Sequence, residues 1–270
     1  MKYNIYKQEE RLGIIMKKII SLLLTMTMVL ALGACGTKTE VNDSTDNGKL
    51  VIGYTIYEPM NYMENGKLTG FDTEFAEAVC KKLNMTPEFV EINWDTKFVT
   101  LNANKIDCIW NGMTISDDVK ANCDVSKAYV KNAQVVVMKK DEADTYKDVE
   151  SLKGLKFAAE AGSAGEEAIK ENGLDGNYSP VAAQTDALMA VAGGQADACV
   201  IDITMAKTMT AEGTSYADLT YSVELTSEEY GIGFRKGSDL KDKVNGAIDE
   251  LVADGTLKAL AEKYEVNRAF

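Results

Sequence analysis

From residue 49 onward, short apolar runs alternate with amphipathic segments, and this alternation occurs twice along the chain. In the segment 71–83, Phe75, Val79 and Leu83 recur at i, i+4 and i+8, which is the spacing of one helix face, and Asp72 is the expected N-cap. The pattern predicts strands at 49–56, 85–92, 106–110, 132–138, 155–160, 178–182, 198–201, 219–223 and 230–234, and helices at 71–83, 95–103, from 116, 164–172, 185–192, 203–212, 240–253 and 256–264. Strands that alternate with helices indicate an α/β architecture with mostly parallel sheets.

The two halves of the chain follow the same order of elements and are connected twice. Each half leads to a strand introduced by an aspartate, Asp107 in the first half and Asp197 in the second. The apolar strand near Asn132 and the strand at Tyr230 are the expected crossings between the halves. Two crossings form a hinge, and ligands bind at domain interfaces and beyond the carboxyl ends of strands. We therefore expect two lobes with a binding site between them.

Residues 1–35 have the pattern of an export signal. Lys17 and Lys18 precede the apolar run 19–32, which is shorter than the roughly 20 residues that span a bilayer. The ending Leu32-Gly33-Ala34-Cys35 resembles a bacterial lipobox, in which the cysteine is diacylated and becomes the new N-terminus. Two acyl chains hold a protein firmly at a membrane. We expect lipidation at Cys35, and the alternative is a signal anchor that stays attached.

Two features bound the folded part of the chain. Met16 offers a second good start, so residues 1–15 carry no structural argument. Residues 36–48 are polar and small, which is typical of a flexible tether between lipid and domain. The remaining chain is long enough for one large domain or two of ordinary size.

Charge and histidine content exclude several classes of function. The net charge of −13 becomes −16 once residues 1–34 are removed, because that segment carries five basic and two acidic side chains. An acidic surface repels nucleic acid and anionic lipid headgroups. The chain has no histidine, which excludes Ser-His-Asp and Cys-His catalysis and any histidine-ligated metal. We expect no cofactor, no metal and no nucleic-acid partner.

The remaining four cysteines are widely spaced, with no CxxC pair. They are Cys80, Cys108, Cys123 and Cys199. The spacing leaves their pairing open, but Cys108 and Cys199 lie in apolar strand-like runs. We expect those two to be buried free thiols.

Several short motifs, in this order, carry a resemblance to a known family. They are Gly70-Phe71-Asp72, Asn111-Gly112-Met113-Thr114-Ile115-Ser116, Ala196-Asp197-Ala198 with Asp202, and Tyr230-Gly231-Ile232-Gly233-Phe234 followed by Lys236-Gly237-Ser238-Asp239. Over about residues 48–270 the chain resembles the type II periplasmic-binding-protein fold, in the branch of solute-binding lipoproteins that serve polar amino acid importers. The fold expected is α/β and two-lobed, with lobe 1 from 49–133 plus 230–270, lobe 2 from 134–229 and a two-strand hinge.

The resemblance implies a function in uptake. The chain is expected to be a monomer on the outer face of the cell membrane that binds an amino acid or related small polar solute. It would deliver this solute to the permease and ATPase of an ABC importer without chemistry of its own. One alternative is a receptor that feeds a sensor. Another is a dehydratase-like enzyme on the same fold, with Glu160 and Asp202 as a carboxylate pair.

The family's contacts in lobe 1 can be carried over to matching positions. Tyr57 and Trp94 match aromatic residues that pack on the ligand side chain, although ordinary core packing is the simpler alternative. Asn111, Gly112 and Thr114 match a turn that offers backbone groups and a hydroxyl to the ligand. Glycine allows close approach of the backbone, and a helix follows whose N-terminus favours anions.

In lobe 2, Gly162 and Ser163 match the loop that binds the ligand carboxylate, and their amides are expected to be free for it. Asp202 matches the acid that binds the ligand ammonium, and it could also cap the helix from 203. A buried carboxylate needs a cationic or hydrogen-bonding partner. Glu160 is added to the candidate ligand-binding residues because relatives commonly place a non-acidic residue there.

One departure from the family pattern concerns the ligand carboxylate. The family motif after Thr114-Ile115-Ser116 runs acid, acid, arginine, and here Val119 stands at the arginine position. A bidentate arginine clamp has no isosteric replacement. Lys120 could supply the missing positive charge, although its side chain points about 100° away on the helix. Lys97 or Lys131 could supply it from elsewhere. Alternatively, the ligand is cationic or weakly anionic, such as a basic amino acid, an amine or a modified amino acid.

Overall fold

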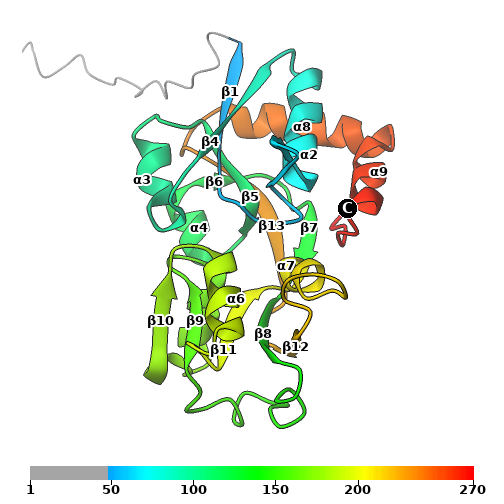
Figure 1. Ribbon diagram of the computed structural model, residues 1–270. Helices are drawn as coiled ribbons and strands as arrows, with labels where there is room; N and C mark the ends of the chain where they lie inside the picture. The colour runs from blue at the N-terminus through cyan, green and yellow to red at the C-terminus, as the bar shows by residue number, and fades with distance from the viewer. Residues whose placement is uncertain (1–47) are drawn as a thin grey trace, which may run out of the picture. The chain divides into compact units, whose positions relative to one another are not determined.

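The computed structural model describes residues 48–270. The predicted signal, the lipidation at Cys35 and the tether up to residue 47 lie outside the described residues. Within residues 48–270, no helix is both long enough and apolar enough to span a membrane. The described chain forms two large β-sheets, which occupy separate halves in Figure 1. We call them lobe 1 and lobe 2, each with its adjoining helices.

Lobe 1 is built on the sheet order β4-β1-β5-β13-β6, with β7 also paired to β13. Its strands are β1 (Lys49–Tyr54), β4 (Thr86–Glu91), β5 (Cys108–Thr114), β6 (Asp124–Val125), β7 (Val130–Asn132) and β13 (Glu228–Phe234). β1 lies parallel to both β4 and β5, whereas β13 runs antiparallel to β5, β6 and β7. A small hairpin, β2 (Tyr62–Glu64) with β3 (Lys67–Thr69), precedes the first helix.

Lobe 2 has the sheet order β10-β9-β11-β8-β12. Its strands are β8 (Gln134–Lys139), β9 (Phe157–Glu160), β10 (Tyr178–Val181), β11 (Ala198–Asp202) and β12 (Leu219–Glu224). β9 is parallel to β10 and β11, and β8 is antiparallel to β11 and β12. Both sheets are therefore mixed, because the strands next to the interlobe crossings run against the parallel part.

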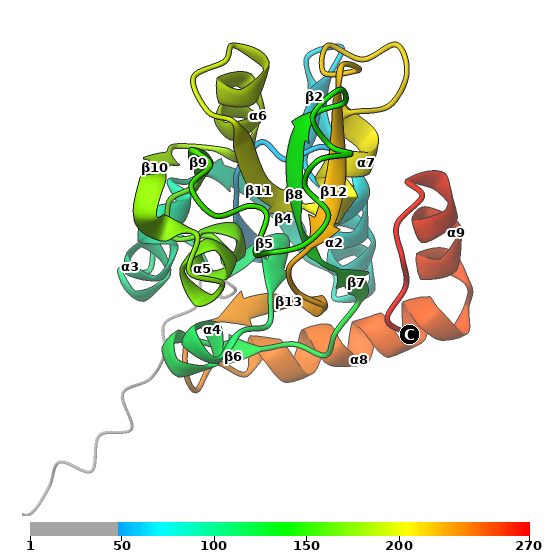
Figure 2. The same ribbon diagram turned by 90° about the horizontal axis from the view of Figure 1, so that it is seen from below.

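The helices join the strands in the predicted alternation. They are α2 (Phe71–Lys82), η2 (Trp94–Thr96), α3 (Lys97–Asn102), α4 (Asp117–Asn122), α5 (Ala164–Glu171), η3 (Asp175–Asn177), α6 (Gln184–Ala192), α7 (Ile203–Met209), α8 (Leu240–Ala253) and α9 (Thr256–Lys263). In lobe 1, α8 and α9 pack together and both contact α2 (Figure 2). In lobe 2, α5 and α6 contact β9 and β11, so the helices cover the strands that reach the cleft.

Aromatic side chains fill the centre of lobe 1. Phe75 of α2 meets the ring of Trp110 edge-on, with centroids 4.9 Å apart, and lies 5.4 Å from the ring of Tyr129. Phe71 stacks on Tyr129 from the same helix. Edge-to-face and offset pairs of this kind add to the free energy gained from burial. The helix period read from the sequence therefore places α2 correctly.

Three local predictions are wrong, each because a longer-range contact decides. Asp72 is not the N-cap of α2; Gly70 holds that position with φ 118°, and Asp72 is buried in the first turn of the helix. The segment Asn111–Thr114 is not a turn but the end of β5, which pairs with β13 through an irregular register and has Gly112 at φ 57°. The single strand predicted at 132–138 is divided at Ala133 into β7 and β8, one in each sheet.

The cysteine prediction is confirmed. Cys108 and Cys199 are buried and lie in no disulfide, and the same holds for Cys80 and Cys123. Burial raises the pKa of the Cys123 thiol to about 11, so these side chains act as small apolar core groups.

The repeated aspartate has one structural role in both lobes. The Asp107 carboxylate accepts a hydrogen bond from the amide of Val51 at 2.9 Å, and the Asp197 carboxylate accepts one from the amide of Lys156 at 2.7 Å. Each aspartate thus joins the start of its own strand to the neighbouring chain segment. Only Asp107 is buried, and it also forms an ion pair with Arg235 at 3.1 Å.

Replacement of these two aspartates should have unequal effects on stability. Asp107→Ala leaves the buried Arg235 guanidinium without its carboxylate, so we expect a loss of about 3–5 kcal/mol in the free energy of unfolding. Asp197→Ala removes an exposed hydrogen bond and should cost about 1 kcal/mol. Urea denaturation of both variants measures the difference, and equal losses would contradict the assigned role of the buried ion pair.

Candidate ligand-binding cleft

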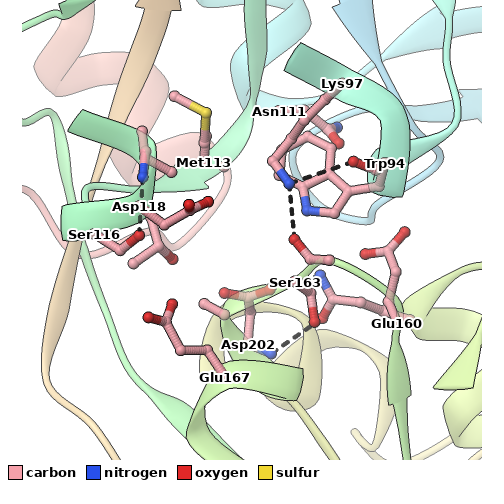
Figure 3. A pocket seen from close by; sticks show the side chains of 16 residues that line it. Trp94, Lys97, Asn111, Met113, Ser116, Asp118, Glu160, Ser163, Glu167 and Asp202 are labelled. Atoms are coloured by element: carbon pink, nitrogen blue, oxygen red, sulfur yellow. Dashed lines mark hydrogen bonds between the residues drawn. The ribbon is translucent and has the colours of Figure 1, made fainter. Parts of the chain in front are cut away.

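A cavity of about 50 Å³ lies between the two lobes (Figure 3). Lobe 1 lines it with Trp94, Lys97, Asn111, Gly112, Met113, Thr114, Ser116, Asp118 and Val119, and lobe 2 with Glu160, Gly162, Ser163, Ala164, Glu167, Gln184 and Asp202. Eight of the nine predicted ligand-binding residues are in this set; Tyr57 is not. The volume has room for a few water molecules, which need about 10–15 Å³ each. A larger ligand can enter only if the lobes or side chains move.

Asn111 and Gly112 are already bonded within lobe 1. The Asn111 amide nitrogen donates to Thr55 O and Asn61 Oδ1, and its oxygen accepts from the Thr55 amide and hydroxyl. The Gly112 amide donates to Asp72 Oδ2 at 2.6 Å. A Cβ on Gly112 would lie 2.6 Å from the Tyr57 ring, so glycine is required at this position. These residues shape the wall of the cavity, while their side-chain and amide donors hold neighbouring loops.

Tyr57 lies behind this wall instead of lining the cavity. Its ring is 2% exposed, and its hydroxyl is 2.6 Å from the hydroxyl of Tyr230. The Tyr230 hydroxyl in turn donates to Asp202 Oδ1 at 2.7 Å. The structure therefore connects Tyr57 to Asp202 through Tyr230, and direct contact of Tyr57 with a ligand stays a prediction.

Lys97 is the only basic side chain among the described residues that line the cavity. Its Nζ donates across the cleft to Gly162 O at 2.7 Å and, within lobe 1, to Trp94 O at 3.3 Å. It also lies 4.8 Å from the centre of the Trp94 ring, a cation–π distance. Burial lowers the pKa of Lys97, and the carboxylate of Glu160 opposes this shift.

The other two lysines considered from sequence are not at the cavity. Lys120 is exposed and forms an ion pair with Asp117 at 3.6 Å, and Lys131 is also exposed. Val119, at the position where the family pattern has arginine, is buried and contributes an apolar surface to the cavity. The positive charge at the site therefore comes from α3 and not from α4.

The loop before α5 differs from expectation in one respect. The Gly162 amide donates to Glu166 Oε2 at 2.7 Å, and the Ser163 amide donates to Glu160 O at 3.2 Å. The prediction that both amides are free for a ligand is therefore wrong. Ser163 caps α5, because its hydroxyl accepts from the Glu166 amide at 3.2 Å. The side chains of Ser163 and Glu166 therefore bond the amides of Glu166 and Gly162 at the start of α5, where an anionic ligand was expected.

Asp202 is the most densely hydrogen-bonded acid in the cleft. Its Oδ1 accepts from Asn132 at 2.5 Å, from Gln134 at 2.9 Å and from Tyr230, and its Oδ2 accepts from Gln184 at 2.6 Å. Asp202 holds the N-cap position of α7, but its side chain makes no capping bond. Its carboxylate oxygens instead accept hydrogen bonds from side chains of β7, β8, β13 and α6.

Glu228 shares two donors with Asp202. Its Oε1 accepts from Asn132 at 2.7 Å, from Gln134 at 2.8 Å and from the Thr114 hydroxyl at 2.8 Å. Burial raises the pKa of Asp202, and repulsion from Glu228 raises it further. The two acids and two amides form a polar network where β7, β8 and β13 pass between the lobes.

Glu160 has a different environment. It ends β9, its side chain is 3% exposed, and its Oε1 has no hydrogen-bond partner within residues 48–270. Burial raises its pKa to about 8, the nearby Asp202 carboxylate raises it too, and Lys97 acts in the opposite direction. An unpartnered buried carboxylate is costly, so this residue needs a functional explanation.

Sequence reasoning missed part of the cleft. Gln184 and Glu167 lie on helices α6 and α5, and a polar residue near a helix start is ordinary in sequence. Asn132 and Gln134 lie where the chain was predicted to cross between the halves, and polar residues in that apolar segment could have marked them as part of the site. Within the described chain, no cluster of three or more Cys, Asp or Glu side chains is arranged to hold a metal ion.

The two-lobed α/β fold with a polar interlobe cleft defines a ligand-binding protein of the type II periplasmic class. The profile of the bacterial extracellular solute-binding proteins, family 3, matches residues 50–267, and the chain belongs to that family.

Individual relatives support the same class. The L-cystine-binding protein TcyJ of Escherichia coli (strain K12) is 32% identical over 230 residues, which cover 83% of this chain and 85% of TcyJ. The arginine-binding extracellular protein ArtP of Bacillus subtilis (strain 168) is 30% identical over 260 residues, covering 92% and 98%. A solved structure of an ancestral arginine-binding protein bound to arginine superposes with a TM-score of 0.75 at 33% identity, covering 80% of this chain and 98% of that chain.

The ligand-free protein should lose stability as the pH rises from about 5 to about 8. Folded Glu160 keeps its proton up to about pH 8, whereas the unfolded group releases it near its ordinary value of 4.5. The folded state therefore binds more protons across this window, and its stability falls as pH increases. Chemical denaturation of wild type and Glu160→Gln at several pH values measures the slope.

Glu160→Gln cannot ionise, so its free energy of unfolding should depend less steeply on pH. The exposed Glu224→Gln is the control and should keep the wild-type slope. An unchanged slope in Glu160→Gln would show that the buried carboxyl is not the group that titrates in this window.

Proposed function

We propose that this chain is the solute-binding component of an ABC importer and that it binds an amino acid in the interlobe cleft. The observation that carries the proposal is the hydrogen-bonded Asp202 carboxylate, which lies at the end of β11 and lines the cavity. The names of the cystine- and arginine-binding relatives support an amino acid as the ligand.

Asp202 supplies the site for the ligand ammonium. A carboxylate oxygen has two lone pairs, and Asp202 Oδ2 accepts one side-chain bond, from Gln184. Its other acceptor position is available to an ammonium group in the cavity. The amide donors around Oδ1 keep the carboxylate oriented, so ligand binding costs little conformational entropy at this side chain.

Lys97 supplies the charge for the ligand carboxylate. An ammonium group has three donors, and Lys97 uses two of them on Gly162 O and Trp94 O. The third can reach an anionic group in the cavity that it lines. A single lysine gives weaker orientation than a bidentate arginine, so here the ligand carboxylate is held by charge more than by geometry.

The lobes close about the two interlobe crossings. We propose lobe 1 as 49–133 plus 230–270 and lobe 2 as 134–229, as the sequence indicated. The direct bond from Lys97 to Gly162 O and the small cavity volume support a closed arrangement. Rotation about the crossings would open the cleft, admit the ligand and bury it again on closure.

We further propose that the chain is anchored outside the cell membrane by lipid on Cys35 and delivers its ligand to the permease and ATPase subunits. The family of extracellular solute-binding proteins supports this location. The relatives named above are binding proteins, and no observation within residues 48–270 favours a sensor or dehydratase role over transport.

Ligand-induced stabilisation tests the binding function. Protein lacking residues 1–35, refolded to remove bound solute, should be stabilised by about 2.7 kcal/mol when an amino acid ligand is present at 100 times its Kd. This corresponds to about 5–10 °C for a chain of this size. Thermal unfolding against all amino acids measures it, and no shift with any of them would reject the proposal.

Asp202→Asn should abolish most of that shift. The substitution keeps the shape but removes the charge that meets the ligand ammonium, so the affinity should fall at least about 30-fold. Titration calorimetry measures the affinity independently of any change in melting temperature. Wild-type affinity in this variant would place the ammonium site elsewhere.

Cys35→Ser tests the anchor. Two acyl chains hold the wild-type protein in membranes, so the variant should appear in the soluble fraction after cell lysis while the wild type sediments with membranes. Mass spectrometry of the N-terminal peptide should show a diacylated cysteine in the wild type. A soluble wild type with an unmodified Cys35 would contradict the lipid anchor.

A further inference from the structure

Glu160 has no partner in a site where the other buried acid has four. Asp202 is surrounded by side chains of Asn132, Gln134, Gln184 and Tyr230. Glu160 is equally buried, but its Oε1 has no hydrogen-bond partner in the described part of the chain. The described residues therefore supply four side-chain donors to Asp202 and none to Glu160 Oε1.

Glu160 faces the cavity and not the core. It ends β9, which lies parallel to β11, so both acids lie at the carboxyl ends of neighbouring strands, at the same edge of the sheet. Figure 3 shows its carboxylate extending from lobe 2 toward the side of lobe 1 that carries Trp94 and Lys97. A ligand in the cavity would lie against both acids.

Lys97 does not neutralise Glu160. Its Nζ is directed to two backbone carbonyls, and residues 48–270 contain no ion pair between the two side chains. The partner that Glu160 requires must then come from the ligand.

The surface beside Glu160 is apolar. Trp94, Met113 and Val119 line the cavity together with the charged groups. Val119 extends this apolar wall at the position where an arginine would have crossed it. Such a wall accommodates a chain of methylene groups between two charged ends of a ligand.

We propose that Glu160 is the counter-ion for a second cationic group on the ligand, so that the cleft selects amino acids with a positively charged side chain. This inference rests on the proposed function, in which Asp202 binds the α-ammonium and Lys97 meets the carboxylate. The ligand class is a basic amino acid, with an ammonium or guanidinium group at the end of an aliphatic side chain.

A protonated Glu160 would instead donate a hydrogen bond to a neutral ligand. Burial raises its pKa to about 8, so the empty site holds the proton at neutral pH. The charged groups that face it are Lys97 of α3, Asp202 of β11 and Asp186 of α6, and Glu167 of α5 and Asp118 of α4 line the same cavity. Acids outnumber bases in this set, so a cation is favoured over a neutral group.

Pairs of ligands that differ only in charge separate these outcomes. Arginine and citrulline have nearly the same shape, as do lysine and norleucine. Calorimetry on the ligand-free wild type should show arginine or lysine binding at least about 30-fold more tightly than its neutral counterpart. Tight binding of citrulline, norleucine or glutamine with weak binding of both cations would overturn the inference and leave the proposed function standing. Binding of no amino acid at all would reject the proposed function itself.

Glu160→Gln tests the residue directly. The variant should bind the cationic ligand at least about 30-fold more weakly, and a neutral ligand should change by less than about threefold. The exposed Glu224→Gln changes the charge of lobe 2 equally and should bind like wild type. Unchanged affinity of Glu160→Gln for arginine and lysine would overturn the inference.

Proton release gives a readout that a purely structural role would not change. A cation that pairs with Glu160 drives off the proton held in the empty site, so binding at neutral pH should release protons. Calorimetry in buffers of different ionisation enthalpy counts them. Glu160→Gln should release fewer protons than wild type, and equal release in the two proteins would contradict the pairing.

Discussion

The buried carboxylate of Asp202 is the constraint on which the rest of the cleft depends. Burying a charge is costly unless donors replace the lost water, and here the donors come from three strands. Asn132 lies on β7, Gln134 on β8 and Tyr230 on β13, so both connections between the lobes are bonded to one acid. Glu228 shares two of these donors. The group proposed to bind the ligand ammonium therefore also fixes the geometry of the hinge.

A second contact joins lobe 1 to lobe 2 across the cleft. Lys97 donates to Gly162 O, and a Cβ at Gly162 would lie 3.0 Å from Asp95 Cα. Glycine at 162 thus lets the two lobes approach closely, while one lysine bond holds them together. It is a single hydrogen bond, so it stabilises closure only modestly. A weak direct bond between the lobes suits a receptor, because most of the free energy that keeps the lobes closed should come from the bound ligand.

The alternation of strands and helices, the α2 face and half of the cavity-lining residues could be predicted from the sequence, because each depends on local periodicity or on a family motif. The polar network could not. Gln134 meets Asp202 only because β8 and β11 pair antiparallel in register, and no local pattern specifies that pairing. The place of Asn111–Thr114 in a strand has the same origin, since β5 pairs with β13 and Tyr230 lies opposite Thr114. The loop amides at Gly162 and Ser163 were misjudged because the Glu166 side chain and the Glu160 carbonyl accept their hydrogen bonds locally.

On the proposed function, the charges at the cleft favour a different ligand from the one that an arginine clamp would hold. An arginine at position 119 would place a second fixed cation beside Asp202 and Glu160 and would balance both acids. With Val119 there, Lys97 alone opposes two buried carboxylates, and Asp118 and Glu167 add further negative charge. Such a cavity lowers the free energy of a ligand that carries more positive than negative charge and raises that of an acidic one.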